Sequence, residues 1–80
     1  METMLDIAIF RTNSGFKIMS TGYHKEVPVD NVLPLDDHAE DVDSLMRRLN
    51  LIVRSQINTQ TILDEKGYKG FKEYLTRIKG

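Results

Sequence analysis

The 80-residue chain contains no cysteine and no tryptophan, and only two prolines. Without cysteine it has neither a disulfide framework nor thiolate metal sites, the usual reinforcement of small secreted domains. We therefore expect an intracellular, cytoplasmic protein. No stretch approaches the roughly 20 apolar residues that a membrane span requires, and no basic start leads into a long apolar run. We expect a soluble protein with no membrane partner and no targeting segment.

Signatures of catalysis and cofactor binding are also lacking. The two histidines, His24 and His38, and the serines stand in no recognisable nucleophile motif. The glycines near the C-terminus do not have the spacing of a phosphate-binding loop. We therefore expect a protein that is not an enzyme and that holds no cofactor and no metal.

A chain of this length forms one domain that buries only about 60 to 65% of its unfolded surface, so its stability margin is thin. The sequence has no internal repeat, no low-complexity stretch and no linker rich in proline, glycine or serine. We expect residues 1–80 to form a single small domain. Dimerisation of two copies is a natural way to reinforce it.

The first third of the chain has the alternating pattern of β-strands. Apolar and smaller or polar residues alternate from Leu5 to Ile9 and again from Phe16 to Ile18, with a glycine-containing turn at residues 13–15 between them. This pattern predicts a hairpin. Residues 23–29 form a further extended segment. We expect two or three antiparallel strands between about residues 4 and 29.

The second half predicts helices. Asp37 and Glu40 have the spacing of a capping box, and the run after them has apolar residues at i, i+3, i+4 and i+7. This stripe comprises Val42, Leu45, Met46, Leu49, Ile52, Val53 and Ile57. Because Gln56 and Gln60 follow on the same stripe, we expect its core-facing part to end near Ile57. The long helix should cover about residues 37–58, and the pattern leaves open a continuation to 66.

The last stretch, residues 67–80, interleaves aromatic and basic residues. On a helical wheel its apolar residues share one face and the lysines lie beside them, which favours a short docking helix over about 70–79 rather than a base-stacking platform. The whole pattern predicts an α+β fold. In it, an N-terminal β-hairpin or three-stranded antiparallel meander packs against one long and one short C-terminal helix.

Charge is distributed unevenly: residues 26–43 contain seven acids and no lysine or arginine, whereas residues 44–80 contain eight bases and three acids. A chain with this charge separation can fold back on itself, pair with a second copy, or present a face of one charge sign to a partner. Carboxylates in this stretch, with His38, suggest a metal site. The calcium-loop glycine is missing, however, and acids also cap helix N-termini. We favour capping, with Asp37 and Asp41 as a surface for a basic partner.

Leu51 lies about 180° from Val42 on the helical wheel, opposite the apolar stripe. A leucine surrounded by arginines has the composition of an interface anchor with a charged rim. An ordinary solvent-exposed face with one stray leucine explains the pattern as well. The predicted protein interface comprises Arg47, Arg48, Leu51, Arg54, Asn58, Asp37 and Asp41.

These features favour a small intracellular regulatory protein of the adaptor or inhibitor type that binds another protein, alone or as a homodimer. Its size suits a bacterial or phage gene. The alternative is a nucleic-acid-binding regulator, whose affinity would fall steeply with salt. Its contact residues would be Arg47, Arg48, Arg54, Lys69 and Lys72.

Overall fold

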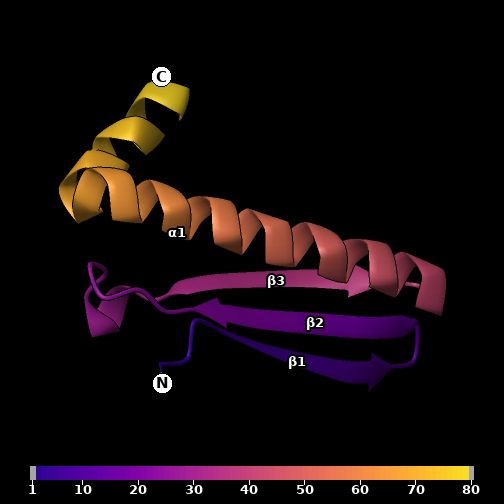
Figure 1. Cartoon of the computed structure of the whole chain (residues 1–80). Helices are drawn as coiled ribbons and strands as arrows, with labels where there is room; N and C mark the ends of the chain where they lie inside the picture. The colour runs from indigo at the N-terminus through magenta and orange to yellow at the C-terminus, as the bar shows by residue number, and fades with distance from the viewer. Residues whose placement is uncertain (1, 80) are drawn as a thin grey trace.

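The computed structural model describes residues 2–79, in which one helix lies across one face of a three-stranded sheet (Figure 1). The strand order is β1-β2-β3 and both pairings are antiparallel. The α+β class with a three-stranded antiparallel sheet is therefore confirmed. The elements are β1 (Leu5–Thr12), β2 (Gly15–Gly22), the one-turn 3-10 helix η1 (Val29–Asn31), β3 (Leu33–Ala39) and α1 (Val42–Lys79).

The predicted hairpin is present as β1 and β2. Thr12 pairs with Gly15 across a two-residue loop, and Ile9 pairs with Ile18 further along the strands. Gly15 has φ 138°, a conformation that residues with a Cβ rarely adopt. A Cβ at this position would also collide with the backbone oxygen of Ala39 in β3. Glycine is therefore required here both by the turn and by the neighbouring strand.

The third strand is not where the sequence indicated. Residues 23–28 form a loop that leads into η1 at Val29, and β3 begins only at Leu33. The prediction was wrong because β3 contains Pro34 and the run Asp36-Asp37-His38, which is untypical of a strand. An edge strand tolerates proline and charge, since one of its sides does not have to pair.

The helix begins about five residues later than predicted. Asp41 caps it, because the Ser44 backbone N–H donates to Asp41 Oδ1 at 2.7 Å. The expected capping box at Asp37 and Glu40 is wrong: Asp37 lies in β3, where its carboxylate accepts the His38 N–H at 2.8 Å. The same capping chemistry therefore acts, but at the next aspartate along the chain.

Helix α1 continues past Asn58 as far as a kink at Gly67, so the long helix does not end near Asn58, and helical backbone resumes beyond the kink up to Lys79. The separate short helix predicted over 70–79 is not confirmed. Within α1, Gly67 has φ 71° and ψ 174°, values outside the helical region. Because glycine adopts a positive φ at little cost, the helix kinks at this residue, and the C-terminal part of α1 runs in another direction (Figure 1).

The core consists of two apolar clusters, one toward each end of the sheet. The first is built on Ile18, Ala39, Leu45 and Ile52, with Phe16 and Leu49 packed against it. The second is built on Val27, Leu63 and Phe71, with Leu33, Ile62 and Tyr68 packed against it. The burial of Phe71 agrees with the predicted docking role of the last segment.

Two buried glutamines lie between these clusters on α1. The Gln56 amide donates to the Leu33 backbone oxygen at 3.3 Å, and the Gln60 amide donates to the Met4 backbone oxygen at 3.0 Å. The expectation that the core-facing stripe ends near Ile57 was therefore wrong. Long amide side chains can be buried where they satisfy backbone carbonyls at strand ends.

Two adjacent residues of α1 test this assignment of its faces. Ile52 is 2% exposed and Leu51 is 63% exposed. We expect Ile52→Ala to lower the free energy of unfolding by about 2 to 5 kcal/mol, because it opens a cavity in the first cluster. Leu51→Ala, the matched control, should change it by no more than about 0.5 kcal/mol. Urea denaturation followed by circular dichroism measures both, and equal losses would contradict the assigned rotation of α1.

Candidate protein-binding surface

Within residues 2–79, the helix leaves one strand of the sheet without a cover. α1 packs against β3 and, less extensively, β2. In β1, Ile7 and Ile9 are the register partners of Ser20 and the buried Ile18, so they point to the helix-facing side of the sheet. Both isoleucines are nevertheless exposed, Ile9 to 46%. The helix-facing side of β1 is therefore an open apolar strip.

Two contacts fix the rotation of α1 over the sheet. Arg48 Nη1 lies 3.5 Å from Asp37 Oδ2 in β3, whereas Gln60 reaches Met4, the residue before β1. One edge of α1 therefore faces β3 and the opposite edge faces β1. Beyond Val42 in its first turn, α1 has three exposed apolar side chains within about 60° of Gln60 on the edge that faces β1, at about 100° per residue. They are Met46, Val53 and Ile57, and all three are exposed, Met46 to 60%.

The strand and the helix thus present exposed apolar side chains on the same side of the molecule. We call Ile7, Ile9, Met46, Val53 and Ile57 the β1/α1 apolar surface. Arg11, Arg47 and Arg54 are exposed and border it, with Asp43 as the nearby acid. Exposed apolar areas with a polar rim are typical of binding sites.

The interface predicted from the sequence is centred on Leu51, on another side of α1, and shares Arg47 and Arg54 with the border of the β1/α1 apolar surface. Leu51 is exposed as expected, together with Arg47, Arg48, Arg54 and Asn58. Its neighbours one turn away on the helix are arginine and serine residues, so Leu51 is a single apolar side chain within a polar area.

The two acids assigned to the same interface have roles inside the molecule. Asp37 pairs with Arg48, and Asp41 caps α1. The structure thus brings Asp37 and Arg48 together and leaves Leu51 apart from the β1/α1 apolar surface.

The five basic residues proposed for nucleic acid lie on both sides of Gly67. Arg48 is paired with Asp37, and Lys72 Nζ lies 5.0 Å from the centre of the Tyr68 ring, a cation–π arrangement. Arg47, Arg54 and Lys69 are exposed. Two of the five cations therefore have partners within the chain.

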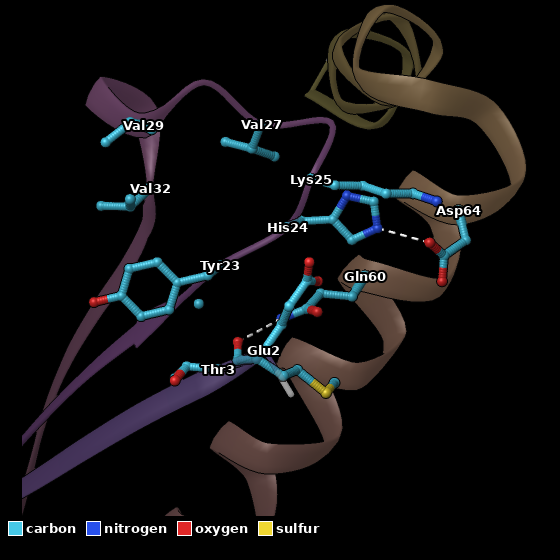
Figure 2. Close-up of a pocket in the computed structure, with 12 residues that line it drawn as sticks. Glu2, Thr3, Tyr23, His24, Lys25, Val27, Val29, Val32, Gln60 and Asp64 are labelled. Atoms are coloured by element: carbon cyan, nitrogen blue, oxygen red, sulfur yellow. Dashed lines mark hydrogen bonds and ion pairs between the residues drawn. The ribbon is translucent and has the colours of Figure 1, made fainter.

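A pocket of about 550 Å³ opens between the segment before β1, the loop after β2, and α1 (Figure 2). At its side, His24 Nε2 lies 2.7 Å from Asp64 Oδ1 of α1. The Glu26 backbone N–H donates to His24 Nδ1 at 3.1 Å. Nδ1 is therefore the acceptor, and the proton on Nε2 is donated to Asp64.

His24 is an anchor rather than a reactive group. Its side chain is almost completely buried, and both of its ring nitrogens have partners within the chain. No nitrogen lone pair is left for a metal or for proton transfer. The imidazole instead attaches the loop after β2 to α1.

The other ionisable groups form no metal cage: within residues 2–79, no three side chains of histidine, aspartate or glutamate come close enough to hold an ion. Near the pocket, a hydrogen bond to the Asp6 carboxylate raises the pKa of Tyr23 above its ordinary value, and desolvation and the negative charge of Asp6 raise it further. Tyr23 is therefore a neutral hydrogen-bond donor at neutral pH. In the described part of the chain, no helix is long and apolar enough to cross a bilayer.

Comparison of the chain with protein-family models, with curated proteins and with solved structures finds no match in any of the three. The inference of function therefore depends on the surface and the pocket described above.

His24 provides a test of the pocket wall. We expect His24→Ala to lower the free energy of unfolding by about 1 to 3 kcal/mol, because the Glu26 N–H and the Asp64 carboxylate both lose a partner. Amide hydrogen exchange should become faster in residues 24–31. Lys25→Ala, at the exposed neighbouring position, serves as the control and should leave both quantities nearly unchanged. An unaltered exchange rate in His24→Ala would show that the loop is held by other contacts.

Proposed function

We propose that this protein is a small non-enzymatic binding protein that docks an amphipathic helix of another protein on the β1/α1 apolar surface. The observation that carries this proposal is the uncovered strand β1, whose exposed isoleucines lie on the same side as the exposed apolar edge of α1. A helix is about 10 Å wide, which is about two strand spacings. A second helix over β1, parallel or antiparallel to α1, would complete the helical layer.

The charges around the surface specify the partner further. Arg11 borders it on the strand side, and Arg47 and Arg54 border it on the helix side. We infer that the docked helix carries acidic residues beside its apolar stripe, since guanidinium groups pair well with carboxylates. Binding of this kind, with apolar anchors at i, i+3, i+4 and i+7, is a recurrent mode of peptide recognition.

The internal pairing of His24 supports a role without catalysis, because the most buried ionisable group beside the pocket has no free nitrogen. A regulator of the adaptor or inhibitor type needs only such a docking surface. Binding of DNA or RNA through the exposed cations Arg47, Arg54 and Lys69 is the second candidate, and its affinity would fall steeply with salt concentration.

The proposal predicts which substitution weakens partner binding. We expect Val53→Asp to reduce the affinity for the partner protein by about tenfold or more, because a carboxylate would be desolvated at the contact. Leu51→Asp, at the more exposed position two residues earlier on α1, should retain binding within about twofold. Partner capture with both variants isolates the partner, and titration calorimetry of each variant with the purified partner measures this difference.

Isoleucine methyl NMR locates the contact without mutation. On addition of the partner helix as a peptide, the δ1 methyl signals of Ile7, Ile9 and Ile57 should shift, while those of Ile62 and Ile78 should not. If Leu51→Asp loses binding and Val53→Asp keeps it, the interface is the one around Leu51. If the captured molecule is a nucleic acid whose affinity falls steeply with salt, the second candidate holds.

A further inference from the structure

The outer edge of β1 has a row of unpaired backbone groups. The Tyr23 N–H donates to the Met4 oxygen at 2.9 Å, in continuation of the register that pairs Leu5 with Gly22. Because bonded residues alternate along an antiparallel ladder, the even-numbered residues of β1 bond to β2. Among residues 2–79 no strand lies beyond β1. Four residues therefore direct their N–H and C=O groups outward: Leu5, Ile7, Ile9 and Arg11.

The two edges of the sheet differ in their protection. β3 carries Pro34, two aspartates and a histidine, and its Asp37 is paired with Arg48 of α1. These features oppose the addition of another strand. β1 has no proline, its pairing with β2 runs without a bulge over eight residues, and four of its central residues, Ile7 to Phe10, are apolar. An edge of that kind is a template for strand pairing.

We propose that β1 pairs antiparallel with β1 of a second copy, about a twofold axis at Ala8. In this register Ile7 lies opposite Ile9 of the second copy, and Leu5 lies opposite Arg11. It is the only symmetric register that pairs all four outward residues within the strand, and its four bonded pairs make about eight backbone hydrogen bonds. No two like charges face each other, because Asp6 lies opposite Phe10. The product is a six-stranded antiparallel sheet.

The second copy completes the β1/α1 apolar surface. A twofold axis perpendicular to the sheet places both helices on the same face, so that Ile7 and Ile9 of both copies form one floor between them. With a strand spacing of about 4.8 Å, each α1 axis would lie about 10 Å from the twofold axis. The two helices would then be about 20 Å apart, room for one more helix at the usual packing distance of 8 to 10 Å. The binding of a partner helix between the two copies rests on the function proposed above, whereas the pairing of the two β1 strands does not.

Ala8 permits a direct test by cross-linking. At the axis, the two copies of residue 8 form a non-bonded pair with Cα atoms about 4.5 Å apart, within the range of a disulfide. The chain has no cysteine of its own. We expect Ala8→Cys to oxidise to a covalent dimer. Met19→Cys, its register neighbour on the central strand and on the same face, is the matched control and should remain uncross-linked.

Charge substitutions test the pairing in solution. Sedimentation velocity should give a dimer for the unmodified chain, monomers for Ala8→Lys and for Ala8→Glu, and a dimer again for their equimolar mixture. Circular dichroism checks that each variant is folded. A monomeric unmodified chain, dimers of both single variants, or a dimer that Ala8→Cys fails to cross-link would overturn pairing at Ala8.

These outcomes separate the two proposals. A monomeric variant that still binds the partner helix refutes only the requirement for a second copy. A stable dimer that binds no helix refutes only the proposed function.

Discussion

One helix is wide enough to cover only about two strands, and this limit decides which apolar side chains of the molecule are buried and which remain exposed. A helix about 10 Å wide matches two strand spacings of about 4.8 Å. α1 lies over β3 and β2, so the first apolar cluster forms beneath it, while within residues 2–79 no helix covers β1. The exposure of Ile7 and Ile9, and of the α1 edge that faces them, has this single geometric cause.

Polar contacts determine which two strands are covered. Arg48 attaches one edge of α1 to Asp37 of β3, and the amides of Gln56 and Gln60 attach the middle of α1 to backbone oxygens at the same end of the sheet. Gly22 makes room for the first of these amides, because a Cβ there would collide with the Gln56 side chain. Apolar packing alone is non-directional, and these hydrogen bonds give the helix one rotation and one position.

The hairpin and the exposure of Leu51 could be predicted from the sequence, because both follow from local periodicity. The position of β3 could not be predicted. Pro34 and two aspartates are untypical of a strand, and the aspartates resemble a helix capping pattern, which favoured a helix start at this place. Met46, Val53 and Ile57 were assigned to the core because periodicity shows that a residue is on the apolar face, not whether the sheet beneath is covered. The seven apolar residues of the stripe span a wide arc around the helix, and that width was the signal that some of them would remain exposed.

The burial of Gln56 and Gln60 was missed for a related reason. Composition identifies glutamine as polar, but the carbonyl oxygens that accept its hydrogen bonds come from segments more than 20 residues away in the sequence. A pattern read along one helix does not contain that information. Contacts with distant segments of the chain therefore decided that both glutamines are buried.

The order of the elements along the chain also has a consequence for synthesis on the ribosome. The hairpin consists of local contacts, whereas its buried Ile18 packs against Leu45 and Ile52 of α1, which are made later. At elongation rates of about 5 to 20 residues per second, the hairpin would wait on the order of seconds for its helix, although hairpins themselves form within about 1 to 10 μs. During that interval Ile18 is as accessible as Ile7 and Ile9, so a nascent chain presents a wider apolar surface than the finished protein does.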